Sequence, residues 1–142
     1  MCWCLFMWSR SLKPGDASLG DSTFVVDLVR PLFGALGVTD GDLMQFIVRK
    51  LAHFSEYLVM GVLAFLALPD LRGRDFKGRR GAAVACALIV VLVPCADECI
   101  QLFVPGRSGM VRDVLIDMVG AVCGLALSLG TCRLRRRRAQ RL

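Results

Sequence analysis

Long apolar stretches separated by short polar segments dominate the chain after about residue 40. The first can form one helix over residues 43–71, the second covers residues 81–104, and the third covers residues 110–132. A helix rises 1.5 Å per residue, so about 20 apolar residues cross a bilayer. The first stretch reaches that length only if its polar opening, from Lys50 to Glu56, enters the edge of the membrane. We therefore expect three transmembrane helices.

The amino-terminal part has a different pattern. Residues 1–8 are apolar but too few to span, which indicates either an interfacial segment or a truncated first span. Residues 9–22 are rich in Ser, Gly, Pro and Asp, which favours a loop outside the membrane. In residues 24–36 apolar side chains recur every three or four positions. This spacing predicts an amphipathic helix on the membrane surface, ended by Gly34 and Gly37.

Two short motifs predict where a helix begins and how another helix packs. Thr39 and Asp42 have the spacing of a capping box, which places the start of the first long helix here. Gly120 and Gly124 form a GxxxG step in the last apolar stretch. Such a step allows two helix backbones to approach closely. Chance spacing in a glycine-rich chain is the alternative.

The composition agrees with a membrane protein. Of the 142 residues 56% are hydrophobic, and the mean hydropathy is +0.59, which exceeds that of an ordinary soluble domain. The seven cysteines lack the paired CxxC spacing of zinc sites, so we interpret them as packing residues. The expected fold class is all-α. It is a polytopic membrane helix bundle with three full transmembrane helices, a short or truncated first one and an interfacial amphipathic helix.

The charge pattern predicts an orientation. Five Lys or Arg residues lie within residues 72–80 and six lie within 133–141, whereas the turn between the second and third long stretches carries only Arg107. By the positive-inside rule, the basic loop 72–80 and the carboxyl terminus are cytoplasmic, and Arg107 faces the outside. Because the basic tract at 133–142 directly follows a span and has no interleaved aromatic residues, we expect it to bind the bilayer and not nucleic acid.

With that orientation, ionisable residues of all three spans lie at one depth. His53 and Glu56 open the first span, Glu98 and Gln101 close the second, and Asp113 and Asp117 open the third. Within each pair the spacing is three or four residues, so both members project in a common direction. Charged residues within spans usually face a bundle interior or a wet cavity. We therefore expect these side chains to meet.

Two segments carry a family resemblance. RKLAHFSEYLVMGVL and ADECIQLFVPGRSGMVRDVLIDMVGAVCG resemble the VanZ family over residues 50–124, and the likeness extends weakly to MWSRSLKPG. The family pattern has a Lys, a His and a Tyr opening one helix, an acidic residue and a Gln ending another, a Gly-Arg turn, and an Asp ahead of a glycine-containing helix. Asp117 stands where an Asn is common. The matching positions are Lys50, His53, Glu56, Tyr57, Glu98, Gln101, Arg107, Asp113 and Gly120. We expect a VanZ-like membrane domain over residues 1–132 and a basic tail over residues 133–142.

The resemblance implies a role in the envelope of a bacterial cell. The family takes its name from a protein associated with low-level resistance to teicoplanin, a glycopeptide antibiotic. A multi-pass protein of the bacterial cell membrane, acting in envelope biology or in glycopeptide resistance, is what the likeness implies. Substrate and oligomeric state are left open by the sequence.

Two readings of the polar cluster stay open. In the first the protein is not an enzyme, and Lys50 or Arg107 neutralises carboxylates in a structural network. In the second the membrane-embedded cluster binds or acts on a lipid or a lipid-linked envelope precursor, with His53 as acid or base and Glu98 or Asp113 orienting it. No established catalytic motif is present, which favours the first. A divalent metal held by His53, Glu56, Glu98 and Asp113 is a variant of the second, but because no dense metal motif supports it we assign neither a metal nor a cofactor.

Overall fold

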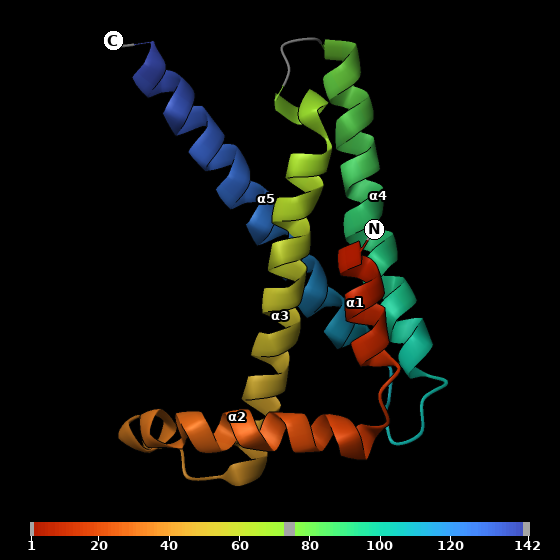
Figure 1. Cartoon of the computed structure of the whole chain (residues 1–142), viewed down its shortest axis with the longest axis vertical. Helices are drawn as coiled ribbons and strands as arrows, with labels where there is room; N and C mark the ends of the chain where they lie inside the picture. Colours follow the sequence, from red (N-terminus) through yellow and green to blue (C-terminus); the bar gives the residue numbers. More distant parts are fainter. Residues whose placement is uncertain (1, 73–75, 141–142) are drawn as a thin grey trace.

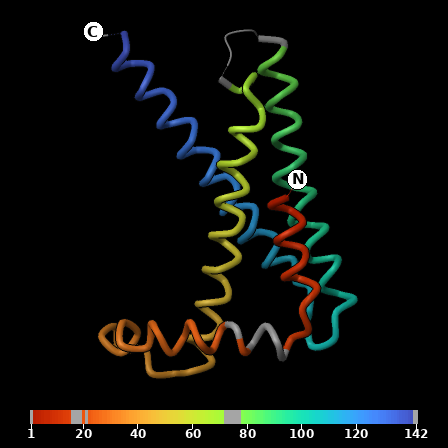
Figure 2. Tube along the Cα trace, in the orientation of Figure 1, coloured from red at the N-terminus to blue at the C-terminus, as the bar shows by residue number. Residues whose placement is uncertain are grey.

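The computed structural model describes residues 2–72 and 76–140, so residues 73–75 of the expected basic loop and 141–142 of the tail lie outside the described residues. The described chain is all-helical, as predicted, and has three helices long and apolar enough to cross a membrane. Figures 1 and 2 show their arrangement. The elements are α1 (Cys2–Ser11), α2 (Gly15–Ala35), α3 (Gly41–Ala67), the 3₁₀-helix η1 (Pro69–Arg72), α4 (Phe76–Gln101) and α5 (Val111–Ala139).

The short helix α1 packs along one side of the bundle. It runs beside α4 and also contacts α3 (Figure 1). Met7 is buried in one core cluster with Tyr57, Met60, Val90 and Ala121. The apolar residues at this end of the chain therefore cover part of the α3–α4 surface.

The expected loop over residues 9–22 is mostly helical, so that prediction was wrong. Only three residues separate α1 from α2, which begins at Gly15 after Pro14. The reason is a tertiary contact, since the Gly15 N–H donates to the carbonyl of Pro105, 3.1 Å away. A Cβ on Gly15 would overlap the carbonyl oxygen of Gly106, so only glycine allows this approach. Packing against the α4–α5 turn thus overrides the turn-forming composition.

The amphipathic helix is confirmed and is longer than predicted. α2 lies across the end of the bundle, at the end where α3 begins (Figure 1). Val26 is buried against Met44 and Val48 of α3, which fixes α2 to the rest of the fold. The helix ends at Ala35, and Gly37 follows with φ +75°, a conformation that glycine adopts without strain.

The start of α3 is one residue from the predicted cap. Asp40, not Thr39, is the N-cap, and its carboxylate accepts hydrogen bonds from the N–H groups of Asp42 and Leu43. An Asp oxygen satisfies the free amides of the first turn and also favours the positive end of the helix dipole. The helix ends at Ala67, four residues before the predicted limit, because Pro69 opens η1.

The predicted glycine step forms the closest helix contact in the bundle. α3 and α5 pack together more extensively than any other pair of elements. A Cβ on Gly120 would lie 2.5 Å from the carbonyl oxygen of Phe54, and one on Gly124 would overlap that of Leu58. From the other helix, a Cβ on Gly61 would overlap the carbonyl oxygen of Ala121. We call this contact the α3–α5 seam. Beyond it, α5 continues as a helix through the basic tail to Ala139 and diverges from the bundle (Figure 1).

Candidate functional site

Polar side chains from α3, α4 and α5 meet near the end of the bundle that α2 crosses. Each long helix contributes a side chain that contacts another helix or the turn between helices. The ion pair of Lys50 with Asp113 joins α3 to α5, and His53 Nδ1 lies 3.8 Å from Asp117 Oδ1. On α4, the Glu98 carboxylate accepts from the N–H of Met110, 2.9 Å away, immediately before α5. The three spans are therefore tied together by charged groups at one level.

The most deeply buried part of the site is a group of three side chains from three helices. His53 of α3, Asp97 of α4 and Asp117 of α5 each have a nitrogen or oxygen atom within 4.8 Å of the other two. Asp97 is 1% exposed and Asp117 is 0% exposed. We call these residues the buried triad. Tyr57 is also fully buried. Its side chain lies near the carboxyl groups of Asp97, Asp117 and Glu98.

Glu98 and Gln101 form the part of the site closest to the α4–α5 turn. Gln101 Nε2 donates to Glu98 Oε1 over 3.2 Å, and both side chains are buried. The second oxygen of Glu98 accepts a hydrogen bond from the Met110 N–H, which places the negative carboxylate at the positive N-terminal end of α5. Asp117, and not Glu98 or Asp113, is the carboxylate nearest His53.

Glu56 turns away from the triad towards α1. Its carboxylate forms an ion pair with Arg10, with Nε and Oε1 3.0 Å apart, and the Trp3 indole donates to its backbone carbonyl over 3.0 Å. The metal set suggested by the sequence, His53 with Glu56, Glu98 and Asp113, is thus not a metal-sized group among the described residues. Glu56 instead anchors α1 on the bundle.

Arg107 holds backbone carbonyls and not a carboxylate. Its guanidinium donates to the carbonyls of Lys13 and Arg10, over 3.1 and 3.3 Å, and so fixes the end of α1 against the α4–α5 turn. Burial lowers the pKa of Arg107 from its ordinary value, and the nearby positive charge of Arg49 lowers it further. Because arginine remains charged in proteins, these two guanidinium groups place concentrated positive charge in this region.

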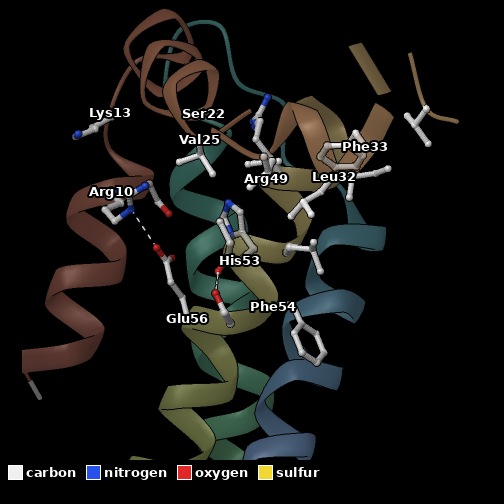
Figure 3. Close-up of a pocket in the computed structure, with 18 of the residues that line it drawn as sticks. Arg10, Lys13, Ser22, Val25, Leu32, Phe33, Arg49, His53, Phe54 and Glu56 are labelled. Carbon is white, nitrogen blue, oxygen red and sulfur yellow. Dashed lines mark hydrogen bonds and ion pairs between the residues drawn. The ribbon is translucent and has the colours of Figure 1, made fainter. Parts of the chain in front are cut away.

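A large cavity opens beside the triad, between α2 and α3 (Figure 3). Its volume is about 880 Å³, within the range of pockets that hold drug-sized ligands. Four basic side chains line it, those of Arg10, Lys13, Arg49 and Arg107, together with three serines and Glu56, whose carboxylate is paired with Arg10. Apolar side chains of α2 and α3 make up most of the remaining lining. His53 lies on the cavity wall and also belongs to the buried triad. The imidazole therefore connects the two parts of the site.

Sequence reasoning missed three residues that the fold brings to this site. Asp97 was not singled out, although it precedes Glu98 and stands four residues before Gln101 on the same helix. No sequence pattern marked Arg10 or Arg49 as a residue of the site. Arg10 lies in what the composition predicted to be a loop, and Arg49 is one of several basic residues around the start of α3.

The fold and the site define a polytopic helical membrane protein with a charged cluster at one end of its spans. Comparison with known protein families gives one match, to VanZ/LLP1, over residues 1–133. The chain belongs to this family, and the match includes the amino-terminal helices that lie before the 50–124 stretch of the resemblance. No curated protein and no solved structure matches the chain.

Proposed function

We propose that this VanZ/LLP1 protein binds a lipid with a phosphorylated head group at the outer end of its bundle and acts through that lipid in the cell envelope. The observation that supports it is the cavity between α2 and α3, which combines a cluster of basic side chains with an extended apolar wall. A lipid phosphate has both matching parts, an anion and a hydrocarbon chain.

The basic end favours an anion because two of its charges repel each other. The charge of Arg49 acts unfavourably on Arg107, and the carboxylates of Asp97 and Glu98 act in the opposite direction. No carboxylate among the described residues forms an ion pair with Arg107. A bound phosphate would relieve this repulsion. Guanidinium groups match phosphate oxygens in geometry and can bind them through two parallel hydrogen bonds.

The apolar wall accounts for the tail of the ligand. Val25, Val29, Leu32 and Phe33 of α2 line the cavity along one side, and Leu51 lines it from α3. Leu32 is 67% exposed in the protein alone, which is costly in water but suits a surface that contacts hydrocarbon. The same helix lies across the bundle end, so a lipid would keep its head group at the membrane surface while its chain follows α2 (Figure 1).

The outer location is supported by the charge pattern. Two spans, α4 and α5, separate the basic residues near 72–80 from those at 133–141, so both tracts belong on the same side of the membrane. The positive-inside rule makes that side cytoplasmic. A protease site placed after Leu142 should then resist cleavage in intact cells and be cut after the membrane is permeabilised. Cleavage in intact cells would place the cavity on the cytoplasmic side.

Binding to purified protein tests the ligand class. The protein is reconstituted in nanodiscs of neutral phosphatidylcholine and titrated with a polyprenyl phosphate, its uncharged polyprenol, phosphatidylglycerol and inorganic phosphate. We expect the polyprenyl phosphate to bind more tightly than the alcohol and inorganic phosphate. Preference for phosphatidylglycerol would identify an ordinary phospholipid as the ligand. Equal binding of the polyprenyl phosphate and the uncharged polyprenol would reject the proposal.

Arg49 offers a variant that removes charge from the cavity without disturbing a described hydrogen bond. A lost charge-assisted hydrogen bond costs about 1.5–3 kcal/mol, or roughly ten- to a hundredfold in Kd, so Arg49→Gln should weaken polyprenyl phosphate binding by that factor. Arg112→Gln is the matched control, because Arg112 lies outside this cavity, beside the ring of Phe46. Equal effects of both variants would indicate nonspecific attraction to the membrane surface.

A second candidate function is an enzyme that acts on the same head group. The observation in its favour is the position of His53 on the cavity wall and beside Asp117, where an imidazole can exchange protons with a bound phosphate. Release of phosphate from a bound polyprenyl phosphate or diphosphate, lost in His53→Gln while lipid binding persists, would establish it. Binding without turnover would leave the protein as a lipid-binding component.

A further inference from the structure

We propose that His53, Asp97 and Asp117 form a binding site for one divalent transition-metal ion, of the Zn²⁺ or Mn²⁺ class, inside the membrane bundle. This inference does not require a lipid in the cavity, because Asp97 and Asp117 do not line the cavity and only His53 belongs to both sites. It also revises the expectation from the sequence, which assigned no metal.

The first observation is the geometry of three potential ligands on three different helices. One ligand atom from each residue lies within 4.8 Å of the other two. Nitrogen and oxygen ligands about 2.0–2.2 Å from a Zn²⁺ ion lie roughly 3.4 Å from one another in a tetrahedral site. The ligand atoms would therefore need to approach one another by at most about 1.4 Å to reach this geometry.

The second observation is that the ligand atoms are buried and have no hydrogen-bond partner among the described residues. This applies to His53 Nδ1, to Asp97 Oδ1 and to both carboxylate oxygens of Asp117. Buried polar atoms are normally hydrogen-bonded, and buried carboxylates that stay charged are paired with a cation or coordinate a metal. Asp117 in particular is fully buried, and neither of its carboxylate oxygens has a hydrogen-bond partner among the described residues.

The third observation is that the neighbouring cationic side chains are paired with other groups. Lys50 pairs with Asp113, and Arg10 pairs with Glu56. Arg107 donates to backbone carbonyls. Gln101 and Ser11 hydrogen-bond with Asp97, but both side chains are uncharged. The charge that would balance Asp97 and Asp117 is therefore not supplied by these groups, and an ion from outside the chain would supply it.

The helix backbones hold the ligands in place. At the α3–α5 seam, Gly120 lies against the backbone of Phe54. Phe54 is the residue after His53 on α3, and Gly120 lies three residues after Asp117 on α5. Tyr57 lies one turn beyond His53 and beside both carboxyls, where its hydroxyl can support a ligand by a hydrogen bond. An imidazole with two carboxylates suits Zn²⁺ and Mn²⁺, and His53 gives an ion access from the cavity.

Metal content and affinity of the full chain test the proposal. The protein is purified in detergent with a tag that contains no histidine, stripped with a chelator and titrated with Zn²⁺, Mn²⁺ and Mg²⁺ separately. We expect about one equivalent of Zn²⁺ or Mn²⁺ per chain and much weaker binding of Mg²⁺, which prefers oxygen ligands and water. Failure of the folded wild-type protein to bind either ion stoichiometrically would overturn the proposal.

Matched variants separate the triad from other acidic groups. Asp117→Asn and Asp97→Asn should each weaken metal binding by at least about tenfold. Substituting a residue that only hydrogen-bonds to a metal ligand already has an effect of that size. Glu98→Gln is the control, because it removes a buried carboxylate next to Asp97 and keeps an oxygen for the Met110 N–H. Unchanged metal binding in both Asp variants would assign the ion to other groups, such as the cysteines, and reject the triad.

A spectroscopic signature keeps the test decisive if an Asp variant does not fold. The chain contains one histidine, so nitrogen-14 coupling from an imidazole to bound Mn²⁺ can come only from His53. We expect this coupling in electron spin echo modulation of the wild-type protein and its loss in His53→Gln. Stoichiometric Mn²⁺ without imidazole coupling would show that the ion lies elsewhere and would contradict the proposal.

Discussion

The two sides of α3 differ in how closely another helix approaches. Towards α5 the backbones are in contact through glycines, and carbonyl oxygens occupy the space where a side chain would begin. Towards α2 only the cluster around Val26, Met44 and Val48 packs tightly, and the remaining space forms a cavity of about 880 Å³. The side of α3 that faces α5 is therefore closely packed, whereas the side that faces α2 borders a cavity large enough for a ligand.

This difference indicates a division of tasks within the end of the bundle that α2 crosses. A seam of glycines fixes the separation of α3 and α5, so it holds His53 and Asp117 at a constant distance. The α2 side carries exposed apolar residues and can accept a lipid without disturbing the seam. His53 lies at the boundary, on the cavity wall and in the buried triad. The following changes test how separate the two sides are.

The largest effect is expected from a side chain inserted into the seam. In Gly124→Val the new Cβ would overlap the carbonyl of Leu58, so α3 and α5 must separate, and we expect a loss of about 3 kcal/mol or more, or no folded protein. The free energy of unfolding in mixed micelles measures it. Gly130→Ala, on the same helix in open space, should be neutral or slightly stabilising. Wild-type stability of Gly124→Val would show that the seam is not tight.

A smaller loss is expected when the seam loses its ion pair. Lys50 and Asp113 are 21% and 17% exposed at their side chains, so Lys50→Met leaves a largely buried carboxylate unpaired and should destabilise the fold by about 2–3 kcal/mol. Arg30→Met is the comparison on α2. It breaks the pair with Asp27, which is 58% and 59% exposed, and should change stability by less than about 0.5 kcal/mol.

A double variant distinguishes the charge from the packing. If the unpaired Asp113 carboxylate causes the loss, Lys50→Met combined with Asp113→Leu should recover most of the stability. Equal destabilisation by Lys50→Met and Arg30→Met would instead show that water reaches both ion pairs. The pair between α3 and α5 would then contribute no more to stability than the exposed pair on α2.

The sequence predicted the spans because that signal is local. Apolar length and the basic tracts depend only on neighbouring residues, and so do the glycine step and the stop at Gly37. The site depended on contacts that no local pattern records. The turn of α2 onto Pro105 made a helix out of a loop-like composition and brought Arg10 and Arg107 together. Asp97 was equally hidden, since its importance comes from facing Asp117 across two helices.

A change on the α2 side should affect ligand binding and leave the fold intact. Leu32 lines the cavity and is 67% exposed, so Leu32→Trp would place an indole in the space for the lipid chain. We expect about tenfold weaker polyprenyl phosphate binding, equivalent to roughly 1.4 kcal/mol, with unchanged stability. Leu28→Trp is the matched control, because Leu28 is 72% exposed on the same helix and outside the cavity. Equal loss in both variants would place the ligand elsewhere on α2.

The smallest effect is expected in cells, where resistance associated with this family is low-level. Expression in a teicoplanin-sensitive Gram-positive host should raise the inhibitory concentration of teicoplanin slightly, and His53→Ala and Glu98→Gln should reduce that rise at equal abundance in the membrane. His53→Ala tests the boundary between the two sides, because His53 belongs to both. If the variants instead disappear from the membrane, the seam and the cavity form one structural unit, and the division of tasks is wrong. If wild type leaves susceptibility unchanged, the lipid and metal sites serve another envelope process, since neither proposal depends on the antibiotic.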